Sequence, residues 1–370
     1  MKKYYSSDNI RAQNCQYNLI IGKRSNGKSY DALYHGIDDC VKSGYKAQFA
    51  LVRRWDEDFA KQRASSMFQS LLCDGNGENQ IEKLTGGRYN NIYYYSRKWY
   101  FAKWDEDEQR LIKSENPFAF GFSLSAMEHD KSTSYPFVKT IIFDEFITRG
   151  SYLKDEFVLF MNVVSTIVRD RLDVKIFMLA NTVNQYAPYF DEMGLYRIRE
   201  QKPGTIDIYQ MGDSDLHVAV EYCADTDKIK QSKTNNNLYW NFNNSRLQMI
   251  TDGVWEMDLY PHCPCSYKSS EIVFTFFIVF KSDVLQCECI LHDMSQFIFI
   301  HRKTTPIKHP DTDLIYSLDY DCRPNYKRRI MRPTTPVEQR ITVLFNMDKV
   351  FYQDNQTGEI VRNFIEQSEM

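Results

Sequence analysis

The stretch Asn18-Leu19-Ile20-Ile21-Gly22-Lys23-Arg24-Ser25-Asn26-Gly27-Lys28-Ser29-Tyr30 decides the fold expected for the first part of this chain. Its apolar start predicts a buried strand. The pattern G-x-x-x-x-G-K-S then predicts a phosphate-binding loop that opens a helix at Lys28. The two glycines let backbone N–H groups turn toward phosphate oxygens, and the helix N-terminus adds a partial positive charge. The residues expected to hold ATP are Gly22, Lys23, Arg24, Ser25, Asn26, Gly27, Lys28 and Ser29.

Within this loop two side chains have distinct expected roles. Lys28 reaches the β- and γ-phosphates, and Ser29 offers its hydroxyl to Mg²⁺. Mg²⁺ and ATP are therefore the predicted ligands of this part of the chain.

A second motif ends a predicted buried strand in two adjacent carboxylates, Asp144 and Glu145. In P-loop ATPases an aspartate at such a strand end holds the Mg²⁺ shell. A neighbouring glutamate within reach of the γ-phosphate acts as a general base on the attacking water. The long separation from Lys28 leaves room for another strand between the two motifs, which favours ATP hydrolases that drive motion over small nucleotide kinases.

Other polar residues follow predicted strands at the same edge of the sheet. Asn181, at the tip of the strand 174–180, is expected to sense the γ-phosphate or to orient water. Arg53 and Arg54 leave the strand 48–55, and one of them is a candidate second phosphate contact. The alternative is that they only pair with the following acids, Asp56 or Glu57.

Basic residues outside these motifs leave two readings open. Arg169 and Arg171 end a predicted helix, where they either complement its dipole or supply an arginine finger to a neighbouring subunit. Lys131, in a polar loop, is a candidate DNA-phosphate contact. The dense basic run Lys327-Arg328-Arg329 with Arg332 is either a nucleic-acid contact or a soluble turn.

Composition narrows the class of protein. The chain has 370 residues with a net charge of -3, so it is not polycationic overall, and any DNA contact must come from local patches. No segment is apolar enough to span a membrane, and no secretion signal is read at the start. Nine cysteines and no export signal suggest a reducing cytoplasm. A zinc site from Cys263, Cys265, Cys287 and Cys289 stays open, although buried apolar cysteines are the preferred reading.

Alternating patterns predict an α/β fold with a mostly parallel sheet. Residues 1–222 are expected to form this domain, 223–265 a linker and 266–370 a smaller domain. The predicted strands are 48–55, 92–103, 118–125, 138–146 and 174–180, and the predicted helices are 30–42, 56–72 and 157–170. The smaller domain begins with a β-meander over 271–280, 284–292 and 296–302, followed by a helix capped at Thr335 and a last short helix after Gly358.

The chain resembles the genome-packaging ATPases of small protein-primed tailed phages of the podovirus type, compact relatives of the large terminases. The resemblance covers about the first 200 residues best. It rests on the phosphate loop and on the order and spacing of Val52-Arg53-Arg54, Lys131-Ser132, Tyr135-Pro136, Thr140 to Phe146, Arg169-Asp170-Arg171, Leu179-Ala180-Asn181 and Pro188-Tyr189-Phe190.

The resemblance implies a P-loop ASCE-type ATPase that translocates double-stranded DNA through a portal into a procapsid. The expected assembly is a ring, with a pentamer as the expected form, docked transiently on the procapsid in the host cytoplasm. A structural RNA is a further candidate partner. Lys28, Ser29, Asp144 and Glu145 correspond to the hydrolytic set. Arg169 corresponds to the trans-acting finger, and Lys131 to a DNA-gripping residue. Asp56 stands where related chains can carry a lysine, which puts a second pore contact in doubt.

The resemblance also implies a C-terminal domain like an RNase H nuclease that has lost its activity. Two-metal nuclease chemistry needs clustered carboxylates, and the interior of the strand 272–280 has none. One rival is an active terminase-type nuclease built on Asp293, Asp319 and Asp321. The other is a non-motor switch that uses ATP only to assemble its partners.

Overall fold

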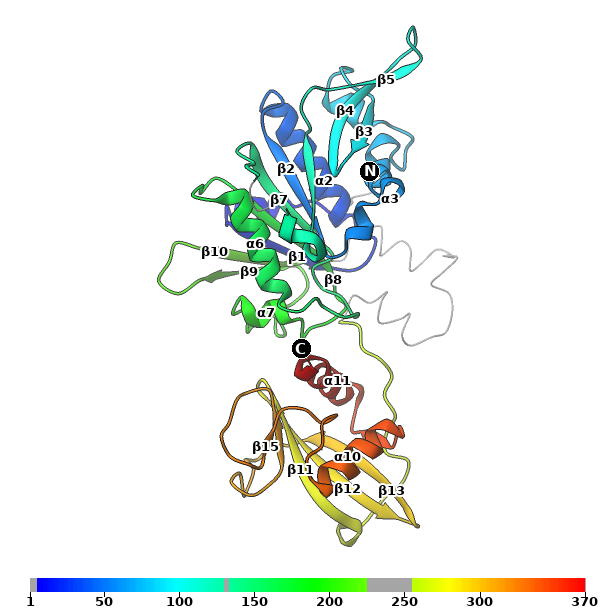
Figure 1. Cartoon of the computed structure of the whole chain (residues 1–370), viewed down its shortest axis with the longest axis vertical. Coiled ribbons are helices and arrows are strands. Elements are labelled where there is room, and N and C mark those ends of the chain that lie inside the picture. The colour runs from blue at the N-terminus through cyan, green and yellow to red at the C-terminus, as the bar shows by residue number, and fades with distance from the viewer. Residues whose placement is uncertain (1–4, 130–132, 225–254, 370) are drawn as a thin grey trace. The chain divides into compact units, whose positions relative to one another are not determined.

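The computed structural model describes residues 5–129, 133–224 and 255–369, which divide into two compact units. Unit 1 is Met1–Trp255 and unit 2 is Glu256–Met370. The division falls inside the range 223–265 that the sequence suggests as a linker. Each unit has its own sheet (Figure 1).

Unit 1 is built on a ten-stranded sheet with the order β3-β4-β6-β2-β7-β8-β1-β10-β9, and β5 pairs with β4. The six central strands, from β6 to β10 along this order, are parallel. The antiparallel strands lie at the two edges. The strands are β1 (Tyr17–Gly22), β2 (Gln48–Arg53), β3 (Asn91–Tyr95), β4 (Lys98–Asp105), β5 (Arg110–Lys113), β6 (Ala119–Ser123), β7 (Val138–Asp144), β8 (Lys175–Asn181), β9 (Thr205–Gln210) and β10 (His217–Tyr222).

The predicted mostly parallel α/β sheet is confirmed. The strand β8 lies between β1, which delivers the phosphate loop, and β7, which ends at Asp144. Along the chain, strands β2 to β6 lie between the two motifs, so the expectation of an intervening strand is confirmed as well. Because these strands are parallel, Gly22, Asp144 and Asn181 all end at one edge of the sheet.

Helices cover both faces of this sheet, because alternate side chains of each strand point to opposite sides. On one face Leu19 and Ile21 of β1 pack in a core with the buried residues of α6. On the other face Ile20 packs in a core with those of α2. The helices of unit 1 are α1 (Asp8–Ala12), α2 (Lys28–Lys42), α3 (Lys61–Ser66), α4 (Gln69–Leu72), α5 (Gln80–Leu84), α6 (Glu156–Val168) and α7 (Pro188–Glu192), with 3-10 helices η1 (Asp56–Phe59) and η2 (Leu124–His129).

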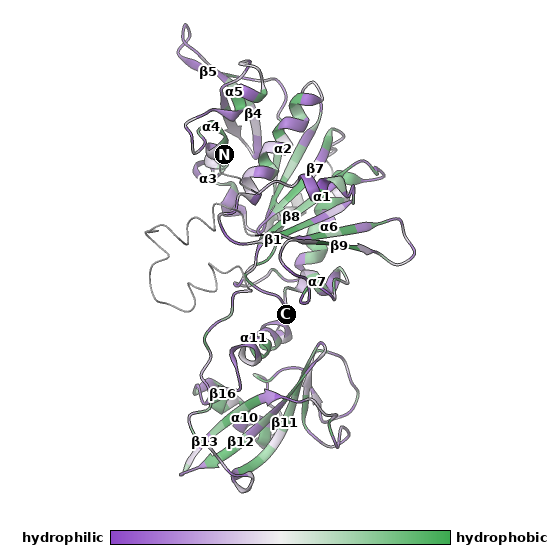
Figure 2. Cartoon of the chain, turned by 180° about the vertical axis from the view of Figure 1, so that it is seen from behind, coloured by the Kyte–Doolittle hydropathy of each residue, from purple (hydrophilic) through white to green (hydrophobic). Residues whose placement is uncertain are grey.

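Figure 2 shows the hydrophobic residues gathered along the strands of both sheets.

Two predicted elements of unit 1 are wrong in form. The single strand 92–103 is a hairpin of β3 and β4, which turns at Ser96 and Arg97 with φ of 48° and 57°. Neither residue is glycine, so the usual signal of such a turn is missing. The predicted helix 56–72 is broken into η1, α3 and α4, because Ala60 is extended there (φ -56°, ψ 139°).

Unit 2 contains a six-stranded sheet with the order β15-β14-β11-β12-β13-β16. The expected meander is confirmed as β11 (Ile272–Phe280), β12 (Asp283–His292) and β13 (Ser295–Arg302). Strand β14 (Ile315–Ser317) pairs in parallel with β11, and β15 (Tyr326–Lys327) pairs in parallel with β14. At the other edge β16 (Val350–Tyr352) pairs in parallel with β13. A short 3-10 helix, η3 (Ser269–Glu271), precedes β11.

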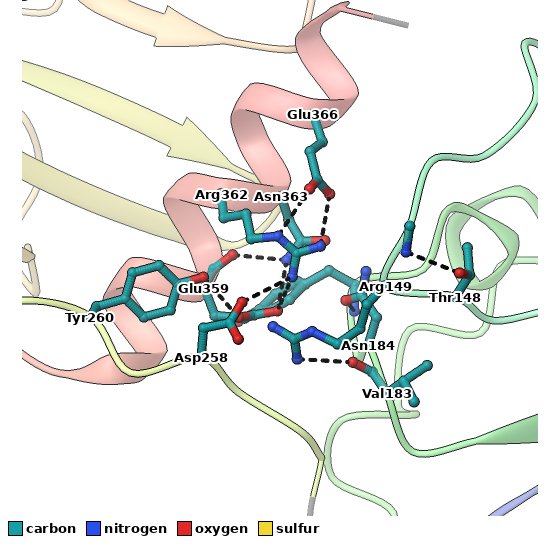
Figure 3. Close-up of polar contacts among 12 residues, drawn as sticks. Thr148, Arg149, Val183, Asn184, Asp258, Tyr260, Glu359, Arg362, Asn363 and Glu366 are labelled. Atoms are coloured by element: carbon teal, nitrogen blue, oxygen red, sulfur yellow. Dashed lines mark hydrogen bonds and ion pairs between the residues drawn. The ribbon is translucent and has the colours of Figure 1, made fainter. Parts of the chain in front are cut away.

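Two helices close unit 2. Helix α10 (Pro336–Asn346) begins at the expected N-cap, where the Thr335 hydroxyl accepts a hydrogen bond from the Glu338 N–H at 3.3 Å. Helix α11 (Asn355–Glu369) begins before Gly358 and is longer than predicted. In α11, Arg362 donates to Glu366 at 2.9 Å, and Glu359 accepts from the Tyr260 hydroxyl at 2.9 Å (Figure 3). None of the helices that the structure describes is long and apolar enough to cross a membrane.

Candidate nucleotide-binding site

The phosphate loop links β1 to α2 and needs glycine at both of its ends, for different reasons. Gly27 is the N-cap of α2 and has a φ of 102°, a conformation that residues with a Cβ rarely adopt. Gly22 packs against Cys223, the residue after β10, and an added Cβ would stand 2.8 Å from the Cβ of Cys223. The loop therefore presents its N–H groups at the start of a fifteen-residue helix, whose dipole favours an anion.

Lys28 is folded into this loop. Its Nζ donates to the carbonyls of Gly22 at 3.2 Å and Lys23 at 2.7 Å, and to the Oδ1 atoms of Asn26 and Asn181, both at 3.2 Å. Burial lowers the pKa of the Lys28 ammonium to about 8, while the nearby Asp144 carboxylate acts in the opposite direction. The ammonium is thus held by neutral carbonyl and amide oxygens, which a phosphate can replace.

Ser29 and Asp144 meet across the edge of the sheet. The Ser29 hydroxyl donates to Asp144 Oδ1 at 3.1 Å. Burial raises the pKa of the Asp144 carboxyl above its ordinary value, and the charge of Arg53 opposes that shift. A hydroxyl and a carboxylate oxygen are hard ligands of the type that Mg²⁺ prefers, so this pair fits the expected metal site.

Glu145 has an unusual backbone for a non-glycine residue. Its φ is 64°, a left-handed conformation that costs about 1–2 kcal/mol. Its side chain is largely exposed at the cleft, and Arg53 Nη1 lies 2.8 Å from Glu145 Oε2. Arg53 Nη2 also lies 3.3 Å from Asp144 Oδ2. Arg53 therefore bridges the two carboxylates, and the alternative pairing with Asp56 is wrong because Asp56 binds Arg97 instead.

These residues surround one cleft of about 220 Å³. It brings together side chains from the loop, from α2 and from the ends of β7 and β8. Its lining residues are Ser25, Asn26, Gly27, Lys28, Ser29, Tyr30, Asp144, Glu145, Ala180 and Asn181. Of the predicted loop residues, Lys23 is buried and contributes its carbonyl to Lys28, whereas Arg24 is exposed.

The two arginines after α6 differ sharply in their surroundings. Arg171 donates to four backbone carbonyls, those of Tyr135, Pro136, Val138 and Ile167, at 2.7 to 3.1 Å. Arg169 is exposed, and its Nη2 donates to the Thr133 carbonyl at 3.3 Å. Arg171 thus holds the chain before β7, whereas the Arg169 side chain is exposed.

Two further predicted nucleic-acid contacts are Lys131 and the basic run Lys327-Arg328-Arg329. Lys131 lies outside the described residues. The basic run after β14 is engaged within unit 2: Lys327 pairs with Glu338 at 3.6 Å, Arg328 donates to the Leu318 carbonyl, and Arg329 donates to the Ser368 carbonyl. Its reading as a structural turn is therefore the better one.

The cysteine group lacks the arrangement of a zinc site. Cys287 and Cys289 are fully buried on one side of β12, while Cys263 and Cys265 are partly exposed in the segment before β11. Among residues 5–129, 133–224 and 255–369, no three or more His, Cys, Asp or Glu residues are placed to hold a metal ion.

Sequence reasoning named Arg54 as a candidate phosphate contact or partner of Asp56 or Glu57, and it missed the actual partner, Glu156. Arg54 and Glu156 form a buried ion pair behind Glu145, with Nε and Oε2 2.7 Å apart. The only signal was a glutamate beginning an otherwise apolar helix, a position that normally indicates helix-dipole stabilisation rather than burial.

Replacement of Gly22 by alanine tests the packing of the loop. The added methyl overlaps Cys223 and Asn26, so we expect the melting temperature to fall, in line with overpacking costs of about 1–3 kcal/mol, and the affinity for an ATP analogue to fall with it. Thermal unfolding and titration with a fluorescent ATP analogue measure the two effects. Gly150→Ala is the matched control, because its new Cβ would only reach ordinary contact with Thr148. Equal behaviour of the two variants would contradict this packing.

Comparison with known proteins finds chains that are similar to this one. A family model described as "Podovirus DNA encapsidation protein (Gp16)" matches residues 109–199. The DNA packaging protein of Bacillus phage phi29 is 29% identical over 190 residues, which are 50% of this chain and 49% of that protein. The resemblance to phage genome-packaging proteins is confirmed. The match spans about half the length of this curated relative.

Solved structures extend the likeness to both units. The phi-28 gp11 DNA packaging motor has a TM-score of 0.52 and 15% identity, covering 100% of this chain and 99% of that one. The bacteriophage phi-29 viral genome packaging motor assembly has a TM-score of 0.52 and 18% identity, covering 98% of each chain. At these identities the likeness shows a shared fold.

Proposed function

We propose that this protein is an ATP-driven double-stranded DNA translocase that packages a viral genome into a procapsid through the portal. One observation carries the proposal. The cleft joins Lys28 and the Ser29–Asp144 pair to Glu145, in a chain similar to phage DNA packaging proteins. This is the residue set that ATP hydrolysis requires, with a cation on the phosphates, oxygen ligands for Mg²⁺ and a carboxylate base.

The residues divide the chemistry among them. The loop N–H groups and Lys28 bind the β- and γ-phosphates, and Asn181, which contacts Lys28 at 3.2 Å, lies where it orients the γ-phosphate or water. Ser29 and Asp144 hold Mg²⁺, which neutralises phosphate charge when bound. Glu145 accepts the proton of the attacking water. In this structure Arg53 bridges both carboxylates. When ATP is bound, we assign Arg53 to the phosphates, because they are a stronger anionic partner.

The motor roles follow from the same proposal. Subunits form a ring, which we take to be a pentamer, docked on the portal of the procapsid in the host cytoplasm. Arg169 reaches the γ-phosphate of a neighbour, and Lys131 grips DNA phosphates. A structural RNA is a further candidate partner.

We assign residues 1–222 to the ATPase domain, 223–265 to a linker and 266–370 to a vestigial RNase H-like domain. In unit 2 three antiparallel strands are followed by two strands parallel to the first, which supports that assignment. Strand β11 carries no carboxylate. Of the rival ligands, Asp321 is bound by Arg323 at 2.7 Å and Asp293 lies exposed in the turn between β12 and β13. We therefore expect no DNA cleavage.

The arginine finger is tested by complementation on portal-bearing procapsids. Arg169→Ala subunits keep their own hydrolytic residues, and Glu145→Gln subunits keep their finger. Each variant alone is expected to be inactive. In an equal mixture, roughly a quarter of neighbouring pairs join an intact hydrolytic site to an intact finger. Mixing should therefore restore DNA-stimulated ATP turnover up to roughly a quarter of wild type.

Two further results complete this test. Arg171→Ala is the matched variant, and we expect it to lower the melting temperature because it frees four carbonyls, whereas Arg169→Ala should melt like wild type. Mixed rings that form and stay inactive would contradict a finger acting in trans.

A further inference from the structure

Behind the cleft, Arg54 and Glu156 form a buried ion pair with paired, fork-like contacts. Arg54 Nε donates to Glu156 Oε2 at 2.7 Å, and Nη2 donates to Oε1 at 2.9 Å. The two side chains are only 7% and 3% exposed. Arg54 directly follows β2, and Glu156 is the first residue of α6, so the pair joins the sheet to the helix that covers it.

The carboxylate of this pair is satisfied by further hydrogen bonds. Tyr189 donates its hydroxyl to Oε1, and the Leu153 N–H donates to Oε2, both at 2.9 Å. Tyr152 also lies against the guanidinium, whose Cζ is 5.1 Å from the ring centroid. Glu156 is thereby locked in place, and it fixes the orientation of the guanidinium in turn.

The remaining donors of Arg54 point at the backbone of the proposed catalytic segment. Nη1 donates to the carbonyl of Glu145 at 3.2 Å, and Nη2 donates to the carbonyl of Phe146 at 2.9 Å. On the other side, the N–H of Glu145 donates to the Leu179 carbonyl of β8 at 2.8 Å. The peptide groups before and after the Glu145 Cα are thus both held.

These contacts account for the unfavourable backbone conformation of Glu145. Glu145 has a left-handed backbone, and a strained residue keeps its conformation only where the surroundings over-determine it. A buried ion pair is a poor source of stability, because well-packed apolar residues serve as well. Its value lies in geometry, since a planar guanidinium can bind a carboxylate and two carbonyls at once.

We propose that Arg54, oriented by Glu156, is a positioning residue that holds the backbone of Glu145 so that its carboxylate faces the attacking water. This inference rests on the proposed ATP hydrolysis. Arg54 touches neither nucleotide nor water in this assignment. Its loss acts only through the position of Glu145, and misplacement of a catalytic group by about 1 Å costs on the order of a hundredfold in rate.

The test is a double-mutant cycle on the full-length protein, read as DNA-stimulated ATP turnover. Arg54→Lys keeps a positive charge beside Glu156 but lacks the fork that reaches both carbonyls. We expect kcat to fall about 10- to 100-fold while KM for ATP changes less than about threefold. In a Glu145→Gln background the same substitution should change the residual turnover less than about twofold, because no base remains to be misplaced.

Two companion variants keep the result interpretable. Glu156→Gln removes the anion but keeps the side-chain shape, and it should reproduce the fall in kcat. It therefore still tests the positioning role if Arg54→Lys fails to fold. Arg97→Lys is the matched control, because Arg97 pairs with Asp56, which does not line the cleft. This variant should leave kcat unchanged. Thermal unfolding and binding of a fluorescent ATP analogue verify that each variant is folded.

The outcomes separate the inference from the function on which it rests. Unchanged kcat in folded Arg54→Lys and Glu156→Gln proteins would overturn the positioning role. So would an equal fold-loss in the Glu145→Gln background, which indicates general disruption. If wild-type turnover is not abolished by Lys28→Ala, the proposed function itself fails, and the positioning role fails with it.

Discussion

Lys28→Ala is expected to reduce DNA-stimulated ATP turnover by about a thousandfold. The ammonium is the cation that the cleft offers to the phosphates, and loss of one preorganised donor to a developing charge typically costs on the order of 100- to 1,000-fold. The truncation also leaves the carbonyls of Gly22 and Lys23 without the donor that now holds the loop in shape. Both effects act in the same direction, so affinity for ATP should fall together with kcat.

A steady-state assay of phosphate release with and without linear double-stranded DNA measures this effect. Lys42→Ala is the matched control, because Lys42 ends the same helix, is exposed and pairs with Asp38. It should retain wild-type turnover. Turnover that survives in the Lys28 variant would show that another site hydrolyses the ATP.

Glu145→Gln is expected to lower kcat by about a thousandfold while ATP still binds. General bases contribute on the order of 100- to 10,000-fold, and glutamine keeps the shape of the side chain without its basicity. The left-handed backbone is retained, since neither peptide group of residue 145 changes. The fluorescent-analogue titration should therefore give a Kd within about threefold of wild type, in contrast to Lys28→Ala.

Rapid-quench measurement of a single turnover isolates the chemical step of this variant. Glu106→Gln, in the exposed acidic turn between β4 and β5, is the matched control for loss of one carboxylate. A Glu145→Gln protein with wild-type single-turnover rate would remove Glu145 from the role of base and leave Asp144 as the nearest carboxylate in the cleft.

The parts of the site that sequence reasoning could predict are those encoded locally. The phosphate loop is one continuous segment, and the two carboxylates stand at the end of an apolar strand. The parallel sheet then brings Lys28, Asp144 and Asn181 to one edge. Arg54 and Glu156 could not be paired in this way, because they are far apart in sequence and nothing in either segment specifies the other.

The fold was similarly predictable where patterns are strong. The parallel strands and the meander of unit 2 follow from apolar runs. The β3–β4 turn was missed because Ser96 and Arg97 adopt positive φ without glycine. The region 56–72 reads as helix, yet Phe59 and Phe68 both pack against Trp99, and the helical backbone is interrupted between them at Ala60.

The most direct test of the central claim is ATP-dependent protection of DNA. Linear double-stranded DNA is mixed with cognate portal-bearing procapsids, ATP and the purified protein, and is then treated with DNase. We expect full-length protected DNA with wild type, and none with Lys28→Ala or without ATP. ATP hydrolysis at wild-type rates with no protected DNA, or with DNA cut by the protein itself, would contradict a translocase without nuclease activity.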